Sequence, residues 1–169
     1  MLWAISIFSY LLIFSLLAAL AYRDLKEYIL PDSLNATLAL AFLSFHIITQ
    51  WHVIAPMESL WGGVMGGGLL LLIRTIANKF YKADSLGLGD VKLMAAAGLG
   101  LGQPHILVAL IIGSGMGLLH GLCIGYADRK TNKRKMSLDQ VNVPAGLGLT
   151  VGVAMVTLYQ FGFEWLKTK

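Results

Sequence analysis

The amino-acid sequence predicts an all-α integral membrane protein, a bundle of about six transmembrane helices forming a single domain over residues 1–169. Hydrophobic residues make up 57% of the chain and charged residues only 13%, about half the charged fraction of a soluble domain. Several apolar runs approach the roughly 20 residues that a helix needs to cross a bilayer. Helices are expected because the bilayer core offers no water to backbone groups, and these runs lack the alternation of β-barrel strands.

Six apolar segments are candidate spans. They cover residues 2–22, 33–50, 59–78, 90–102, 105–126 and 142–164. The first has no basic residues ahead of its apolar run, so we interpret it as a retained span rather than a signal peptide. The fourth is short and rich in glycine, and whether it crosses the whole bilayer is left open. The single cysteine, Cys123, lies in an apolar run, so we expect neither disulfides nor a cysteine-rich metal site.

The basic residues predict the orientation of the chain in the membrane. Three segments, after the first, third and fifth spans, hold most of them: Arg23, Lys26, Arg74, Lys79, Lys82, Lys92, Arg129, Lys130, Lys133, Arg134 and Lys135. The positive-inside rule then places these segments in the cytoplasm and the N-terminus outside. We expect the basic loop 128–135 to set topology, with binding to anionic lipid as the alternative. A nucleic-acid partner is not expected.

Glycine patterns predict close packing between helices. Gly113, Gly117, Gly121 and Gly125 recur every four residues in the fifth span, and "GGVMGGG" at 62–68 repeats this spacing in the third. A helix face without side chains lets a neighbouring helix approach closely. The third and fifth spans are therefore expected to pack tightly within one bundle. A dimer face is the alternative, so the oligomeric state is left open.

Two of the nine acidic residues, Asp24 and Asp90, are predicted to lie at membrane depth on the cytoplasmic side. Ionisable groups at that depth are costly and are therefore candidates for function. The structural alternatives are an N-cap for Asp90 and a solvated charge beside Arg23 and Lys26 for Asp24. Other acids have simpler predicted places: helix starts for Asp32, Glu58 and Asp139, with Asp32 expected to cap the second span, polar loops for Asp84 and Asp128, and the C-terminal region for Glu164.

A pair of acids predicts a specific chemistry, the hydrolysis of a peptide bond. Two close carboxylates share a proton, so one can take a proton from water while the other donates one to the carbonyl oxygen. The pair titrates as a unit. Gly87 and Gly89, just before Asp90, permit backbone conformations closed to other residues and a close approach of substrate. No Ser-His or Cys-His pair competes with this interpretation.

Several motifs resemble those of a known family. The stretch "GLGD" at 87–90, followed by an apolar helix, resembles the G-x-G-D motif of membrane aspartyl peptidases. The stretch "DLKEYILPDSLN" at 24–35 is similar to the second signature of prepilin peptidases, an Asp followed after six residues by Pro31 and Asp32. "GDVKLMAAAG" places Lys92 as that family does. "VNVPAGLGLTVG" resembles its last segment, with Pro-Ala-Gly-Leu in place of Pro-Phe-Gly-Pro. The resemblance covers nearly the whole chain.

The resemblance implies a function. Prepilin peptidases cleave the basic leader of type IV prepilins and type II secretion pseudopilins at the cytoplasmic face of the bacterial inner membrane. It implies that Asp24 and Asp90 are the catalytic pair and that Gly87, Gly89, Pro31, Asp32 and Lys92 are motif residues near the substrate.

The resemblance also bears on cofactors. Longer bacterial members carry an N-terminal cytoplasmic extension, often with two CxxC pairs, and also methylate the new N-terminus with S-adenosylmethionine. We interpret this chain as a short form without that extension. Peptidase activity is therefore expected without a cofactor, with S-adenosylmethionine involved only if the chain also methylates.

Two other classes of protein are alternatives. The acids of a small transporter would carry a proton or cation, and a structural subunit of a pilus or secretion machine would use the glycine faces. Lys92 is expected to point away from Asp90 as an interfacial anchor, and His120 to be hydrogen-bonded within the bundle. The outer side is expected to hold His46, His52, His105, Trp3, Trp51, Trp61 and Trp165.

Overall fold

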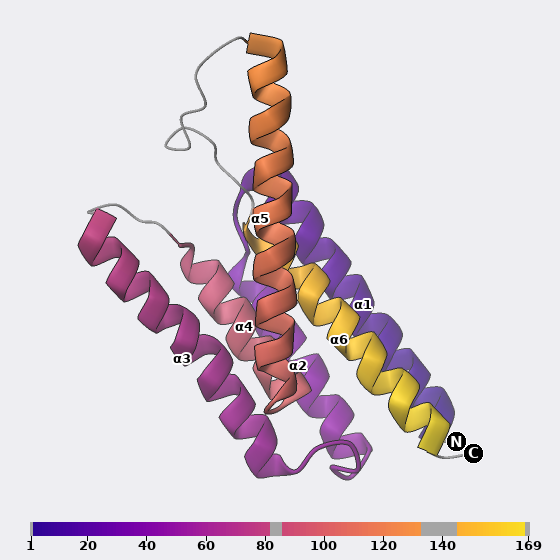
Figure 1. Ribbon diagram of the computed structural model, residues 1–169. Helices are drawn as coiled ribbons and strands as arrows, with labels where there is room; N and C mark the ends of the chain where they lie inside the picture. Colours follow the sequence, from indigo (N-terminus) through magenta and orange to yellow (C-terminus); the bar gives the residue numbers. More distant parts are fainter. Residues whose placement is uncertain (1, 82–85, 133–144, 168–169) are drawn as a thin grey trace.

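The computed structural model describes residues 2–81, 86–132 and 145–167 (Figure 1). These residues form α-helices and no strands: α1 Leu2–Glu27, α2 Asp32–Ile48, α3 Pro56–Tyr81, α4 Leu88–Leu101, α5 His105–Asn132 and α6 Ala145–Lys167. The predicted all-α class is confirmed. Predictions that involve Lys82, Asp84, Lys133, Arg134, Lys135, Asp139 and Pro144 lie outside the described residues, as do those for the side chains of Trp3, Glu164 and Trp165.

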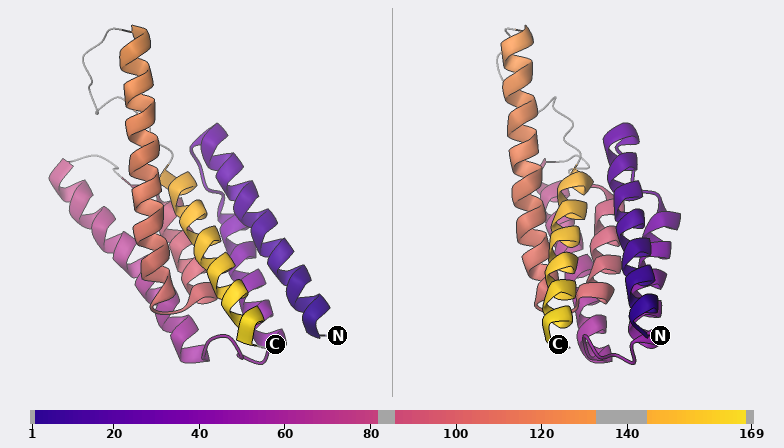
Figure 2. Two further views of the ribbon diagram at one scale, coloured as in Figure 1. Left: turned by 45° about the vertical axis from the view of Figure 1, so that its right-hand side comes forward. Right: turned by 90° about the vertical axis from the view of Figure 1, so that its right-hand side faces the viewer.

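The helices pack as a bundle with α4 at its centre. The start of α1 and the end of α6 lie at the same end of the bundle, and α5 projects beyond its neighbours at the other end (Figures 1 and 2). α4 contacts α2, α3, α5 and α6, and most of its residues are buried. Runs of small residues, with Ala95–Ala97 followed by Gly98 and Gly100, give α4 a narrow surface that four helices can approach.

The helices differ in their capacity to span a bilayer. Three segments are long and apolar enough to cross, namely Ile7–Glu27, Pro56–Phe80 and His105–Ile124, whereas Asp32–Ile48 and Ala145–Gln160 are shorter apolar helices. α4 has 14 residues, which gives about 21 Å at 1.5 Å per residue, less than the roughly 30 Å of the hydrocarbon core. Of the six candidate spans, three are long and apolar enough to cross, by length and composition, and the fourth, whose full crossing was left open, is too short.

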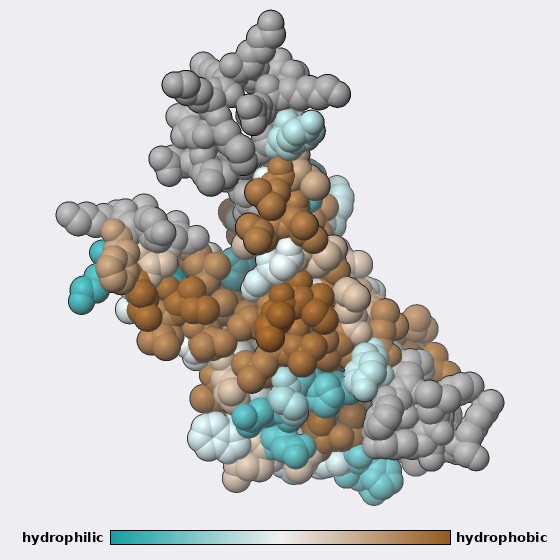
Figure 3. Space-filling model, viewed as in Figure 1, coloured by the Kyte–Doolittle hydropathy of each residue, from teal (hydrophilic) through white to brown (hydrophobic). Residues whose placement is uncertain are grey.

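Apolar side chains cover the outer surface of the long helices. Brown surface extends over the faces of α3 and α5 that are visible in Figure 3. Leu72 and Ile76 on α3, and Leu118 and Leu119 on α5, are exposed. Continuous apolar surface of this extent suits lipid rather than water.

Some predicted boundaries are wrong. α5 continues to Asn132, so Asp128 lies in a helix rather than in a polar loop, and the basic segment after the fifth span starts within that helix. Helical hydrogen bonding satisfies the backbone of such a polar segment even beyond the apolar run, so hydropathy alone misplaced its end. At the start of α3 the prediction holds: the Glu58 carboxylate accepts the Ala55 N–H at 3.2 Å, which caps the helix.

Glycines make the closest helix contacts. A Cβ atom at Gly62 of α3 would lie 2.3 Å from the carbonyl oxygen of Gly98 in α4, and one at Gly98 would lie 2.1 Å from that of Gly62. Between α5 and α6, a Cβ at Gly113 would lie 2.8 Å from the Cα of Leu149. The predicted close packing is confirmed, and its partners are α4 for the third span and α6 for the fifth. Spacing predicts a packing face but not which helix covers it.

The C-terminal end of α4 is buried, and all four of its last carbonyls are satisfied. The Gly98 carbonyl accepts the Gly102 N–H at 2.9 Å. Side chains from three other helices reach the rest: Ser59 Oγ bonds Leu99 at 2.6 Å, His46 Nε2 bonds Gly100 at 2.9 Å and Gln160 Nε2 bonds Leu101 at 3.1 Å. Helix ends leave such carbonyls without intrahelical partners, and lipid offers no water in exchange. These side chains therefore allow α4 to end inside the bundle.

His46, predicted on the outer side, lies at the end of α4 opposite Asp90. It is fully buried, and its ring stacks on Trp51 with 5.4 Å between ring centroids. The bond to Gly100 needs Nε2 to carry the proton. His46 is thus a structural residue of the α4 end.

Replacement of His46 by leucine is expected to lower the free energy of unfolding by about 1–3 kcal/mol, because the Gly100 carbonyl loses a donor in a buried place. Unfolding of the purified chain in mixed detergent micelles measures this change. Thr37→Ala is the control, since the exposed Thr37 hydroxyl bonds only its own helix, at Ser33. Equal stability of the His46 and Thr37 variants would contradict the role of His46.

Candidate functional site

Asp90 lies in the first turn of α4, at the start of the central helix. Gly87 is the N-cap, in an extended conformation with φ −65° and ψ 138°, and it offers no side chain to cap the helix. The Asp90 carboxylate instead accepts the backbone N–H of Gly87, as the third helical residue does in a capping box. A Cβ at Gly87 would lie 3.0 Å from Asp90 Oδ2. The N-cap is therefore Gly87 and not Asp90, the predicted alternative, while Asp90 supplies the capping carboxylate.

Asp24 lies in the last turn of α1 and is buried, with 5% of its surface exposed. Its Oδ2 accepts the Leu147 N–H at 2.7 Å, and its carboxylate also accepts the Gly146 N–H. Both donors belong to the first turn of α6, where the helix dipole favours a negative charge. The alternative of a solvated charge beside Arg23 and Lys26 does not hold, because Asp24 is buried and Arg23 pairs with Glu27 at 2.9 Å.

The first turn of α6 contacts Asp24, a role that the sequence did not identify although the motif at 141–152 contains this turn. A Cβ at Gly146 would lie 2.9 Å from the Asp24 carboxyl carbon, so glycine leaves room for that carboxylate. The sequence contained a signal, a proline and a glycine just before an apolar run, which is typical of a helix start. The partner of that helix start could not be inferred from spacing.

The structure brings Asp24 and Asp90 to one cavity of about 220 Å³. Both are buried, and the charge of Asp24 acts on the Asp90 carboxylate. Two chain segments line the cavity: Asp24, Tyr28, Ile29 and Leu30 from the end of α1 and the turn after it, and Gly87, Leu88, Gly89 and Asp90 from the start of α4.

A tight turn brings these segments together. Tyr28 has a positive φ of 53°, and its N–H bonds the carbonyl of Asp24 at 3.0 Å, which ends α1. Leu30, after this turn, packs against the first turn of α4. A Cβ at Gly89 would lie 2.7 Å from the Cβ of Leu30, so the glycine at this position permits the approach. Pro31 is the N-cap of α2.

Asp32 and Lys92 connect the two motifs at their exposed edge, which corrects two predictions. Asp32 begins α2, but no side chain caps this helix. Its carboxylate instead accepts a hydrogen bond from Lys92 Nζ at 2.6 Å. Lys92 thus crosses to α2 and is not a free interfacial anchor. The Asp32 and Lys92 side chains are 72% and 47% exposed, and water and salt weaken such a pair.

Two further residues hold the start of α4, and the sequence did not single out either for this role. Asn35 is buried in α2 and donates from Nδ2 to the Gly89 carbonyl at 3.2 Å. Arg74 of α3, expected to reach the cytoplasmic surface, donates to the carbonyl of Leu86, just before Gly87. The "GLGD" stretch is therefore held from both α2 and α3.

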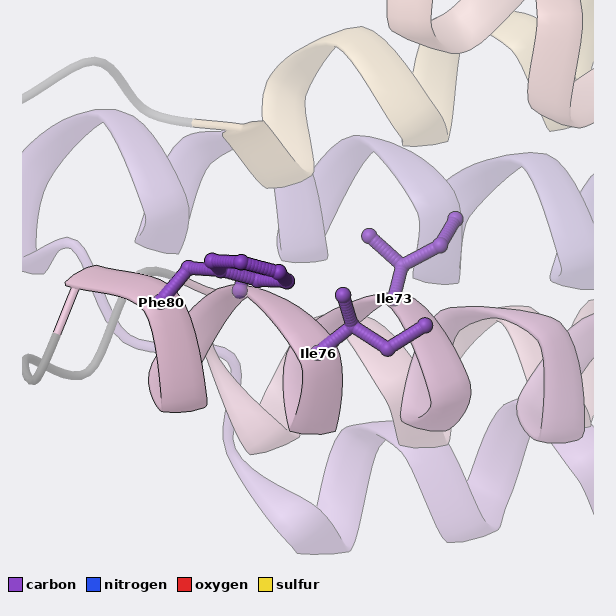
Figure 4. Close-up of a pocket in the computed structure, with 4 residues that line it drawn as sticks. Ile73, Ile76 and Phe80 are labelled. Carbon is purple, nitrogen blue, oxygen red and sulfur yellow. The ribbon is translucent and has the colours of Figure 1, made fainter.

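A second cavity, of about 500 Å³, lies on α3 (Figure 4). Its lining is apolar and consists of Ile73, Ile76, Ala77 and Phe80. It contains no group that could exchange a proton or polarise a carbonyl, so the acid-lined cavity is the candidate active site. Within the described residues, no three His, Cys, Asp or Glu side chains gather as they would around a metal ion.

Comparison with known proteins identifies the family. Residues 11–122 match the model of the type IV leader peptidase family. This match covers more than half of the chain and includes both Asp24 and Asp90. The chain belongs to this family. The resemblance inferred from the motifs is thereby confirmed. No solved structure matches the chain.

The relatives found are longer proteins named prepilin leader peptidase/N-methyltransferase. The chain is 32% identical to that of Aeromonas salmonicida strain A449 over 66% of this chain and 38% of the relative. It is 30% identical to that of Escherichia coli K12 over 71% of this chain and 52% of the relative. The chain thus spans about half the length, or less, of the curated relatives it matches.

Replacement of Gly146 by alanine is expected to destabilise the protein by about 1–3 kcal/mol, because the new methyl group overpacks the Asp24 carboxylate. Unfolding in mixed micelles measures this loss. Gly68→Ala is the matched control, another helical glycine, where a Cβ meets nothing within 4 Å. If the alanine at position 146 is tolerated as well as that at 68, the close contact between α6 and Asp24 is not present.

Proposed function

We propose that this chain is a membrane aspartic endopeptidase that removes the basic leader of type IV prepilins or type II secretion pseudopilins. One observation carries the proposal: two buried acids, Asp24 and Asp90, come from separate helices to one cavity. The family to which the chain belongs is the type IV leader peptidase family, and its relatives are named for the same activity.

The proposed reaction uses the acids as a pair and needs no protein nucleophile. One carboxylate takes a proton from water, and the resulting hydroxide attacks the scissile carbonyl carbon while the other acid protonates the carbonyl oxygen. The C–N bond of the tetrahedral intermediate then breaks, and the leaving amine takes a proton from the pair. Because the two groups titrate together, the starting proton belongs to the pair rather than to Asp24 or Asp90 alone.

The position of the cavity suits a substrate that is half in the membrane. Gly87 and Leu88 are exposed at its mouth, and neither Gly87 nor Gly89 has a side chain to block an extended substrate backbone. We infer that the basic leader enters from the cytoplasm while the apolar helix of the prepilin stays in the bilayer. Pro31, Asp32 and Lys92 then flank the path of the leader.

The proposed location is the bacterial inner membrane, with the N-terminus outside and the acids on the cytoplasmic side. The basic segments after the first, third and fifth spans support this orientation through the positive-inside rule. Cleavage by this chemistry needs no cofactor. S-adenosylmethionine would be needed only for the methylation that the names of the relatives include.

Replacement of Asp24 or Asp90 by asparagine is expected to lower leader cleavage by about 10²–10⁴-fold, since each acid has a proton-transfer role. Co-expression with a type IV prepilin and the mobility of the processed product measure the effect. Glu27→Gln is the control, a nearby exposed acid paired only with Arg23 in the described part of α1. Normal processing by either asparagine variant, once correctly inserted, would exclude the proposed pair. It would leave a transporter or a structural subunit as the alternative.

The proposed pair also predicts a bell-shaped dependence of kcat/KM on pH. At low pH both acids are protonated and no base remains, while at high pH both are ionised and no proton donor remains. Cleavage of a leader peptide by the purified chain across a pH series measures the two limbs. A rate that rises with pH and then stays level would mean that only one ionised group is needed.

A further inference from the structure

Asn35 is a buried polar side chain that lies against the start of α4. It lies in the second turn of α2 with 3% of its surface exposed. Its Nδ2 donates to the carbonyl of Gly89, the residue directly before Asp90. Asn35 therefore connects α2 to the first turn of α4 at the point from which the Asp90 side chain projects.

Stability alone does not explain an asparagine at this position. Its Oδ1 is buried and has no hydrogen-bond partner among the residues that the structure describes. An unsatisfied buried acceptor costs about 1–3 kcal/mol, whereas an apolar side chain of the same shape avoids that cost. Gly89 does not depend on the amide either, because a carbonyl in the first turn of a helix has an intrahelical donor four residues later.

Two side-chain hydrogen bonds join α2 to the start of α4 in the part of the chain that the structure describes, and the one from Asn35 comes from a buried side chain. The one from Lys92 to Asp32 is largely exposed, so solvent weakens it. Gly89 also rests on Leu30, in the turn that follows Asp24. A small shift of Gly89 would therefore change the separation of Asp90 from Asp24.

We propose that Asn35 is a positioning residue, which holds Gly89 so that Asp90 stays at the separation from Asp24 that lets the two share a proton. This inference rests on the proposed peptidase function. The amide of Asn35 then contributes to the rate of the chemical step rather than to the stability of the fold. A displacement of about 1 Å in a catalytic group costs up to roughly 100-fold in rate.

Gln160 provides a matched control at the other end of the same helix. Its amide also donates to a carbonyl of α4, that of Leu101, at 3.1 Å. That carbonyl belongs to the last turn and has no intrahelical donor. Loss of the Gln160 amide should therefore reduce stability, and loss of the Asn35 amide should reduce catalysis.

The test compares Asn35→Leu with Gln160→Leu in the purified full-length chain, with a peptide that spans the leader cleavage site of a type IV prepilin as substrate. We expect Asn35→Leu to lower kcat by about 10- to 100-fold with KM nearly unchanged, to change the bell-shaped pH profile, and to unfold no more easily than wild type. We expect Gln160→Leu to unfold more easily and to keep the kcat and pH profile of wild type. Wild-type kcat and pH profile in Asn35→Leu would overturn the proposal, as would losses of activity and stability that match those of Gln160→Leu.

Hydrogen exchange of the backbone gives a second measurement that does not depend on activity. Asn35→Leu should increase exchange in the first turn of α4, and Gln160→Leu should increase it in the last turn. Unchanged exchange in the first turn would overturn the role of Asn35 even if the wild type cleaves the peptide. Absence of cleavage by the wild type would instead overturn the proposed function, so the two failures are distinguishable.

Discussion

The arrangement of this bundle depends on one constraint, that a helix shorter than the bilayer must have its backbone satisfied without water at a buried end. α4 ends inside the protein, and Ser59, His46 and Gln160 donate to its last three carbonyls. Those donors come from α3, α2 and α6, so the three helices must surround the same point. Glycines such as Gly62 and Gly98 allow the required approach, since their backbones are in direct contact. The central position of α4 follows from these contacts.

The same shortness of α4 produces the candidate site. Because the helix begins at Leu88, within the bundle, Asp90 in its first turn places its capping carboxylate inside the protein. α6 holds Asp24 in a similar way, because the Asp24 carboxylate accepts backbone N–H groups from the first turn of α6. Both acids are thus held by helix starts, which offer donors and a favourable dipole to a buried negative charge. A chain can keep two acids beside one another in an apolar bundle by this means.

Sequence patterns predicted the helices and the two acids but not the side-chain partners. Asp32 was expected to cap α2 and Lys92 to be an interfacial anchor, yet the two form an ion pair between helices. Asn35 stood within a motif without an assigned role, because an asparagine in a helix start is usually explained as capping. These errors have one cause. The spacing of residues along a helix predicts which face of that helix is buried, but the side chain that contacts this face comes from a distant part of the chain.

The sequence by itself determined the all-α membrane class, the family motifs and the identity of the two acids, because apolar length, glycine spacing and local motifs are properties of contiguous residues. The tertiary structure alone decided that the short helix α4 is buried at the centre of the bundle, that α3 packs on α4 and that α5 packs on α6. It also decided that the start of α6 binds Asp24 and that Asn35 reaches Gly89. The last two contacts join residues 123 and 54 positions apart, and the buried surfaces that bring them together exist only when the helices have assembled.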